Sequence, residues 1–253
     1  TALAYTTWYA YRVKAINEMG ESDYSNIDSA RTLNPIVFYD GFESYNVGDV
    51  PRGGGWRDTS RGTSWIRVTD QISNPPGGKS CQFHDPDVGN NFCALDLQAP
   101  VMTQGKLSMN IYLAGVGSFG IWGGDNQNYI TFDIRFRSDG NIYARNGASF
   151  ISLGAYQTNQ WLAITISFDM GSHTYQIYID GRPVGDRLQT QRTDHLDNRF
   201  VRLIGFIDAT IQDVFVDEFT LDLRVAEALQ LFSPLPYAGE GKQKIDQIDR
   251  NEW

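Results

Sequence analysis

The stretch that decides the fold, residues 161–184, reads WLAITISFDMGSHTYQIYIDGRPV. Apolar side chains recur at every second position on both sides of the Gly171-Ser172 turn, which is the period of a strand with one buried face. Asp180-Gly181 then predicts a second tight turn, because both residue types tolerate a positive φ. The stretch therefore predicts an antiparallel hairpin. The side chains expected to pack together across its strands are Leu162, Ile164, Ile166 and Phe168 with Tyr175, Ile177 and Ile179.

Alternating segments continue on both sides of this hairpin. In residues 107–113 and 130–136 every second residue is apolar, and most of the residues between are polar. Further short strands are expected at 65–70, 80–84, 92–97, 118–123, 141–145, 199–206 and 214–221. Clusters of Gly, Asn, Asp and Pro separate them, and no helical pattern intervenes. So many short strands in succession predict an all-β sandwich over residues 36–223.

The overall charge excludes some classes of protein. The 253 residues contain 21 Lys and Arg against 30 Asp and Glu, a formal net charge of −9. We therefore expect no nucleic acid and no anionic membrane surface as partners, because both attract basic proteins. No run of sequence approaches the roughly 20 apolar residues of a membrane-spanning helix. No charged and apolar leader begins at Thr1, so we expect any secretion signal to lie upstream or to have been removed.

Residues 1–32 contain two alternating segments around a glycine turn. They resemble the closing strands of a fibronectin type III domain, and the residues that carry the resemblance are Leu3, Tyr9, Val13, Ala15, Asn17, Gly20 and Ser22. A whole domain of that family needs roughly 100 residues, so the resemblance implies only its C-terminal part. We expect the junction at residues 33–35, because Pro35 ends strand pairing. Residues 224–253 are expected to be a linker or tail.

The hairpin at 161–184 resembles the core hairpin of concanavalin A-like, laminin-G-like jelly-roll domains. Residues 211–221 resemble the last strand of that fold, and residues 38–45 resemble the opening of secreted carbohydrate-binding modules. The resemblance implies an antiparallel jelly-roll β-sandwich that acts as a non-catalytic, lectin-like carbohydrate-binding or adhesive module. Such modules belong to secreted or cell-surface multidomain proteins. The implied partners are a polysaccharide or glycan, and neighbouring modules or subunits.

Two other functions stay open at this point. One is a purely structural module in an extracellular or cell-surface assembly. The other is a jelly-roll glycoside hydrolase or polysaccharide lyase, which needs carboxylates about 5 to 10 Å apart, or a Tyr or His base beside Arg or Asn. The acids of residues 217–222 fall on both faces of one predicted strand, and His84, His173 and His195 are scattered. We therefore expect no catalysis.

The resemblance also implies a structural calcium ion that ties the first strand of the domain to the last. Its ligands would be Glu43, Asp217 and the Lys79 carbonyl, with Asp40 as a further candidate. Asp217 has the parity of the apolar residues that follow it, so we expect its carboxylate to face the core, where it needs a counter-charge or several donors. Ca²⁺ takes about six to eight oxygen ligands and suits such a place. The alternative is that Glu43 and Asp217 meet arginine or backbone N–H partners.

Aromatic residues with outward parity and polar neighbours are the candidates for binding a sugar. Sugars stack on flat aromatic faces, and charged or amide side chains bind their hydroxyls. The candidates of this kind are Tyr112, Trp122, Tyr129, Tyr143 and Tyr178, with Asp133 and Arg135 on the same face as Tyr129. Trp56 and Trp65, near charged residues in a glycine-rich loop, are expected to line an edge of the site. For each of these residues the alternative is ordinary packing against a neighbouring strand or loop.

Cys81 and Cys93 fall in neighbouring predicted strands joined by a short loop. If the protein is extracellular, we expect them to pair across this hairpin, and the disulfide would add roughly 3 kcal/mol of stability. Two cysteines cannot form a disulfide scaffold, and no CxxC pair indicates a zinc site.

Overall fold

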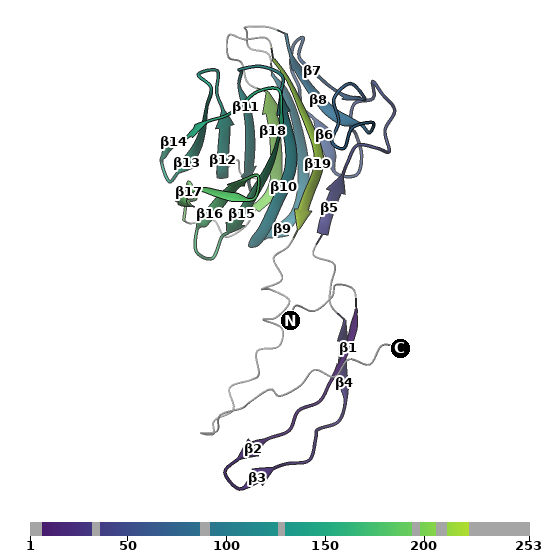
Figure 1. Ribbon diagram of the computed structural model, residues 1–253, viewed down its shortest axis with the longest axis vertical. Coiled ribbons are helices and arrows are strands. Elements are labelled where there is room, and N and C mark those ends of the chain that lie inside the picture. Colours follow the sequence, from purple (N-terminus) through teal and green to yellow (C-terminus); the bar gives the residue numbers. More distant parts are fainter. Residues whose placement is uncertain are drawn as a thin grey trace. The chain divides into compact units, whose positions relative to one another are not determined.

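The computed structural model describes residues 7–31, 36–86, 92–125, 130–193, 198–205 and 212–222. Every regular element in these ranges is a strand, and the sheets are antiparallel (Figure 1), so the predicted all-β class is confirmed. No helix in the described ranges is long and apolar enough to cross a membrane. The chain divides into two compact units, of which one is Ile36–Leu223 and the other includes the N-terminal segment. The expected tail at 224–253 lies outside the described residues.

The N-terminal segment forms two short ladders. Its strands are β1 (Trp8–Tyr11) paired with β4 (Asp28–Arg31), and β2 (Ile16–Asn17) paired with β3 (Gly20–Glu21). Met19 and Ile27 are 94% and 70% exposed, so this segment buries little apolar surface. Its relation to a fibronectin type III domain stays a prediction.

The first sheet of the main unit has eight strands. They are β5 (Ile36–Asp40), β7 (Trp65–Thr69), β8 (Ser80–Asp85), β10 (Gln104–Leu113), β15 (Trp161–Asp169), β16 (Thr174–Ile179), β17 (Arg182–Gln189) and β19 (Gln212–Asp222). Their order is β17-β16-β15-β10-β19-β8-β7, and β5 also pairs with β19. The long strands β10 and β19 therefore lie in the middle of this sheet.

The second sheet has seven strands. They are β6 (Trp56–Asp58), β9 (Cys93–Met102), β11 (Phe119–Gly124), β12 (Ile130–Phe136), β13 (Asn141–Asn146), β14 (Ser149–Ala155) and β18 (Asn198–Gly205). Their order is β14-β13-β12-β11-β18-β9-β6. Apolar side chains from both sheets form one buried cluster, so the two sheets pack face to face as a sandwich (Figure 1).

The hairpin predicted from residues 161–184 is confirmed in register. Ile166 lies opposite Ile177 and Phe168 lies opposite Tyr175. Asp180 and Gly181 have φ values of 50° and 75°, as a tight turn of this kind requires. The strand after the turn, β17, extends the sheet by one more neighbour that the alternation did not predict.

A β-bulge in β19 changes the expected direction of Asp217. Asp217 pairs with Asn110, but the next matched pair is Ser108 with Thr220, so the register shifts between them. Glu218 has a φ of 53° at this point. Because of the extra residue, the side chains of Asp217 and Phe219 point to opposite faces of the sheet, although they are two residues apart. Asp217 therefore lies on the outer face of its sheet with Asn110, and the prediction of a core-facing carboxylate was wrong.

Trp56 is part of the core and not of a sugar-binding edge. Its side chain is 5% exposed and its ring lies 4.9 Å from the ring of Phe219. The indole Nε1 donates to Asp40 Oδ2 at 2.8 Å, which satisfies its polar edge and links β6 of one sheet to β5 of the other. The prediction for Trp56 is therefore wrong.

The two cysteines are free thiols, so the predicted disulfide is wrong. Cys81 lies in β8 of the eight-stranded sheet, between Val68 and Val216. Cys93 begins β9 of the seven-stranded sheet opposite Gly205. Strands β8 and β9 belong to different sheets and do not form a hairpin. Both side chains are buried in the shared core.

We predict that Gly105→Ala destabilises the domain by about 1 to 3 kcal/mol, the usual cost of overpacking a core. A Cβ at Gly105 would lie 2.5 Å from the ring of Phe168, which is 1% exposed and cannot move aside. Gly115→Ala is the matched control, because nothing lies within 4 Å of a Cβ there. Urea unfolding measures the free energy of unfolding of both variants. Equal values would contradict the close packing of Gly105 against Phe168.

Candidate functional site

The outer face of the seven-stranded sheet carries a row of charged and aromatic side chains. The row crosses four neighbouring strands, one residue from each. In order these residues are Asp96 of β9, Arg202 of β18, Trp122 of β11 and Asp133 of β12. Their neighbours along each strand, such as Leu95, face the core. Because side chains alternate, these four residues must lie on the opposite face.

Two carboxylates on this row each hold one guanidinium group by two bonds. Arg202 donates to Asp96 at 2.6 and 2.7 Å, and Arg135 donates to Asp133 at 2.9 and 2.7 Å. Paired bonds of this geometry fix the plane of a guanidinium as well as its position. The hydrogen bond to Asp96 raises the pKa of Arg202, which keeps it charged.

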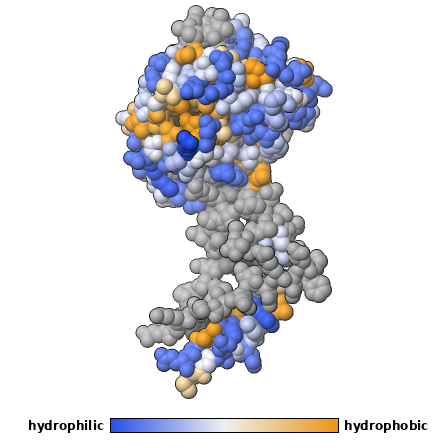
Figure 2. All heavy atoms as spheres, viewed as in Figure 1, coloured by the Kyte–Doolittle hydropathy of each residue, from blue (hydrophilic) through white to orange (hydrophobic). Residues whose placement is uncertain are grey.

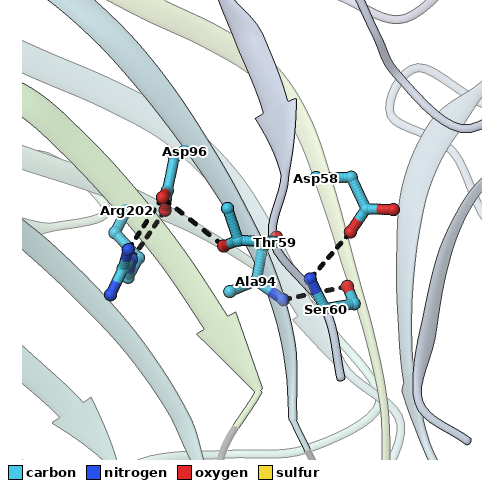
Figure 3. A network of polar contacts seen from close by, with 6 residues as sticks. All are labelled: Asp58, Thr59, Ser60, Ala94, Asp96 and Arg202. Carbon is cyan, nitrogen blue, oxygen red and sulfur yellow. Dashed lines mark hydrogen bonds and ion pairs between the residues drawn. The ribbon is translucent and has the colours of Figure 1, made fainter. Parts of the chain in front are cut away.

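The Asp96 pair is supported by the loop that follows β6. Figure 3 shows the Thr59 hydroxyl directed at Asp96, with an oxygen to oxygen distance of 3.4 Å. Ser60 Oγ accepts the Ala94 N–H at 3.2 Å, and Asp58 accepts the Ser60 N–H at 2.9 Å. These bonds connect the loop to β9 and so hold the edge of the row in place.

Trp122 lies between the two held arginines. The guanidinium carbons of Arg135 and Arg202 are 5.7 and 5.9 Å from the centre of its ring, within the range of a cation–π contact. The indole is partly exposed, and Gly120 and Gly124 occupy the other outward positions of β11. The ring is therefore flanked along its own strand by positions without side chains.

A second group of arginines lies toward the β14 edge, around Phe150. The guanidinium carbons of Arg135, Arg145 and Arg137 are 4.3, 4.6 and 5.5 Å from the centre of the Phe150 ring. Arg145 Nε lies 3.6 Å from Asp133 Oδ2, so one buried carboxylate faces two arginines. We call these three arginines, Phe150 and Tyr143 the arginine edge of the face.

Tyr143 and Asp139 close this edge at the hairpin between β12 and β13. The Tyr143 hydroxyl donates to Asp139 Oδ2 at 2.7 Å, and Arg137 lies 4.5 Å from the Tyr143 ring. This hydrogen bond is the main cause of a lowered pKa at Asp139 and of a raised pKa at Tyr143. Tyr143 therefore stays a neutral phenol.

The structure divides the predicted sugar-binding residues between two faces. Trp122, Asp133, Arg135 and Tyr143 share the outer face of the seven-stranded sheet. The outward residues of the eight-stranded sheet include Trp65, Tyr112 and Tyr178. Tyr129 lies outside the described residues.

The second face has aromatic rings but a different chemical character. The Tyr112 ring lies 5.6 Å from Trp161 and 5.9 Å from Phe215, both in edge-on contacts. Trp65 stacks on His84, whose Nδ1 lies 2.6 Å from Asp213 Oδ1. These rings largely contact one another, so fewer of their faces are open.

Sequence reasoning missed Asp96, Arg202, Arg145 and Phe150. Arg145 and Arg202 both lay in predicted strands at outward positions, so parity could have placed them on a face. Nothing in the sequence showed that β18 lies between β11 and β9, because that order depends on contacts between residues distant in the chain.

The domain surface is mainly hydrophilic in the view of Figure 2, with small apolar patches.

Three of the four predicted calcium ligands lie near one another. Lys79 N donates to Glu43 Oε1 at 2.7 Å, and Asn74 N donates to Asp217 Oδ2 at 2.8 Å. Asp217 is 1% exposed, and its pKa is raised to about 6, mainly by burial, with the nearby charges of Glu218 and Glu43 adding to the shift. The carboxylates therefore have the backbone N–H partners that were the alternative to calcium.

The fourth predicted ligand, Asp40, has another role. Its carboxylate accepts bonds from the Phe42 N–H, the Tyr45 hydroxyl and the Trp56 indole. The Lys79 ammonium donates to the carbonyls of Glu43 and Tyr45. In the described ranges, no three His, Cys, Asp or Glu side chains are grouped in a way that could hold a metal ion. An ion at Glu43 and Asp217 would therefore depend on backbone carbonyls and water for its other ligands.

The comparisons with known proteins agree with this architecture. Residues 106–202 match the family model described as Sialidase-like, CBM domain. That match covers less than half of the chain. It includes most of β10, all of β11 to β17, part of β18 and most of the Trp122 row. It supports a carbohydrate-binding role for this part of the protein. No curated protein matches the sequence.

Solved structures with similar folds include proteins of several kinds. A sialidase is similar over 67% of this chain and 17% of its own length, with a TM-score of 0.59 and 11% identity. The cellulose induced protein Cip1 is similar over 73% and 96%, with a TM-score of 0.57 and 12% identity. A structure from work on endo-acting O-glycanases of the human gut microbiota is similar over 74% and 99%, with a TM-score of 0.52 and 12% identity. At these identities the likeness shows the β-sandwich fold alone.

We predict that, without metal ions, the domain becomes more stable as the pH falls from about 7 to about 5. The folded-state pKa of Asp217 is raised to about 6, above its usual value of 3.8. The folded protein therefore binds a proton at Asp217 before the unfolded chain does, and stability falls as the pH rises through this range. In EDTA, Asp217→Asn should flatten the dependence of Tm on pH.

Asp186→Asn, an exposed position in β17, is the matched control and should keep the dependence on pH. Parallel pH profiles for the Asp217→Asn variant and the unchanged protein would contradict the desolvated state of Asp217.

Proposed function

We propose that residues 36–222 form a non-catalytic carbohydrate-binding module that binds a glycan on the Trp122 face, and that it belongs to a secreted or cell-surface multidomain protein. The observation that carries this proposal is a partly exposed tryptophan held between two arginines, each fixed by its own carboxylate. The match of residues 106–202 to a carbohydrate-binding module family supports it.

This arrangement suits a sugar for physical reasons. A pyranose ring has an apolar face that stacks on an indole, and its hydroxyls need hydrogen-bond partners at the rim. The guanidinium groups of Arg135 and Arg202 are N–H donors of this kind. Their bonds to Asp133 and Asp96 hold them beside the Trp122 ring in fixed planes. Little side-chain freedom is therefore lost when a ligand binds.

The same arrangement argues against hydrolysis at this face. In the described strands of this sheet, the carboxylates that share the face with Trp122 are Asp96 and Asp133. They lie three strands apart, which is about 14 Å, whereas a hydrolase needs roughly 5 to 10 Å. Both carboxylates accept two hydrogen bonds from an arginine, so their oxygens are already engaged within the protein.

A lyase at this face is also disfavoured. A lyase would need a tyrosine or histidine that gives up its proton easily beside an arginine. Tyr143 lies beside Arg137, but its hydrogen bond to Asp139 raises its pKa. Tyr143 therefore keeps its proton near neutral pH and does not supply the base that a lyase needs.

We predict that Trp122→Ala lowers glycan affinity about tenfold or more while Tm changes little, because a partly exposed ring contributes modestly to the core. Trp161→Ala on the other sheet is the matched control and should bind normally. Isothermal titration with glycans found on an array measures affinity. A reducing-end assay on the same glycans should show no cleavage.

Normal binding by Trp122→Ala together with a loss of binding in Trp161→Ala would move the site to the eight-stranded sheet. No binding to any glycan would favour the structural module, and release of reducing ends would favour an enzyme.

We also propose a calcium ion at Glu43 and Asp217. The buried Asp217 carboxylate has backbone N–H partners and feels the like charges of Glu218 and Glu43. A divalent cation would remove this repulsion, and oxygen donors from carboxylates and carbonyls are the ligands that Ca²⁺ prefers. The ion would stabilise the junction of the first and last strands.

If calcium binds there, adding it at about 100 times its Kd should raise the free energy of unfolding by about 2.7 kcal/mol, and EDTA should reverse the gain. Glu43→Gln should reduce the effect, and Asp186→Asn should not. Thermal melts with calcium and with EDTA measure it. Identical melting curves would rule the ion out.

A further inference from the structure

We infer that the glycan recognised by the Trp122 face is acidic, with a carboxylate-bearing sugar that binds at the arginine edge. This inference rests on the proposed function, and it specifies which class of glycan the face binds. It comes from the charge distribution on the face, which differs from that of the whole chain.

The arginine edge has more positive charge than its own acids neutralise. Arg135 and Arg145 share a single carboxylate, Asp133, which is fully buried. Arg135 takes both oxygens of Asp133 in short bonds, and Arg145 keeps only a contact of 3.6 Å. The Nε atom of Arg145 is buried and makes no hydrogen bond to the described residues. Two guanidinium groups thus face one carboxylate, which leaves one positive charge in excess.

Arg137 adds a second cation at the same place. Its guanidinium lies 4.5 and 5.5 Å from the rings of Tyr143 and Phe150, and its charge contributes to the lowered pKa of Asp139. The acid nearest to it in the hairpin, Asp139, already accepts the Tyr143 hydroxyl. Among the described arginines of this edge, Arg137 and Arg145 are held less closely by carboxylates than Arg135 is. We therefore expect these two to bind the ligand.

Phe150 orders these cations without neutralising them. Three guanidinium groups lie within 5.5 Å of its ring centre. Contact with an aromatic face holds a guanidinium while leaving its N–H edge available for a planar anion. A carboxylate is such an anion, and arginine binds it through two parallel bonds. A hydroxyl group of a neutral sugar cannot use this geometry in the same way.

The contrast with the rest of the chain supports a specific role for this edge. The protein as a whole has a net charge of −9, so it repels acidic polymers at long range. The described outer face of the seven-stranded sheet opposes that trend, because its arginines outnumber its acids. The arginines are Arg57, Arg135, Arg137, Arg145 and Arg202, and the acids are Asp96, Asp133 and Asp139. Trp122 lies two strands from Arg145, about 10 Å away. We therefore expect an oligosaccharide that crosses the strands, with one sugar stacked on Trp122 and an acidic sugar near Arg137 and Arg145.

The test compares polygalacturonic acid with the same polymer after reduction of its carboxyl groups, and uses polysialic acid as a second acidic probe. We expect at least one acidic polymer to bind roughly tenfold more tightly than the reduced polymer, with an affinity that falls as salt is added. Biolayer interferometry on the full chain measures both. Comparing the two acidic probes shows whether the carboxylate comes from a uronic or a sialic sugar.

Arg137→Gln and Arg145→Gln should each remove most of the preference for the acidic polymer. Arg137→Gln should change Tm by no more than a few degrees, whereas Arg145→Gln should lower it further, because the Arg145 side chain is only 14% exposed and pairs with buried Asp133. Arg137→Lys keeps the charge but not the planar donor edge, and should recover only part of the affinity. Arg67→Gln, on the outer face of the other sheet, is the matched control and should bind as the unchanged protein does.

Two results would overturn the inference while leaving the proposed function intact. One is equal binding to the acidic and reduced polymers that depends on Trp122. The other is binding to neutral glycans alone. If no glycan of any kind binds, both the inference and the proposed function fail.

Discussion

The structure depends on one constraint, the burial of every second side chain between two sheets. Once Phe168, Ile134 and their counterparts are committed to the shared core, the residues between them must face outward. The core therefore fixes which side chains the protein presents to its surroundings. The row from Asp96 to Asp133 exists because β9, β18, β11 and β12, which come from separate parts of the chain, keep this alternation in register. A slip of one residue in any of them would turn its member of the row toward the core and expose a core residue.

The polar groups on the Trp122 face are arranged to remain rigid. Each carboxylate holds an arginine by two bonds, and each of these arginines lies against an aromatic ring. Asp133 is fully buried beneath these groups, so its charge is balanced inside the protein and is not offered to a ligand. The face thus presents nitrogen donors and ring surfaces, while its carboxylates serve as internal supports. This division explains why a face with two acids is better suited to binding than to acid–base chemistry.

The sequence predicted local features well and distant relations less well. Alternation identified the strands of the core hairpin, their partners and the outward direction of Trp122, Asp133 and Arg135, because these depend on neighbours in the chain. It could not say that Tyr112 and Trp122 belong to different sheets, since the strand order is set by contacts between distant residues. Asp217 was placed on the wrong face because a bulge at Glu218 interrupts the period of two. Trp56 was assigned to a loop edge because its bond to Asp40 has no sequence signature.

The free cysteines have a consequence for how the protein can be handled. Burial raises the pKa of the Cys93 thiol to about 12 and that of Cys81 well above its usual value, so neither forms a reactive thiolate near neutral pH. Both cysteines are free thiols, so the fold does not rely on oxidation. The domain should therefore mature equally well in a reducing cytoplasm and in an oxidising compartment. A cysteine introduced on the surface would then be the one site open to maleimide dyes, which allows a fluorescent reporter to be placed beside Trp122 without altering the native thiols.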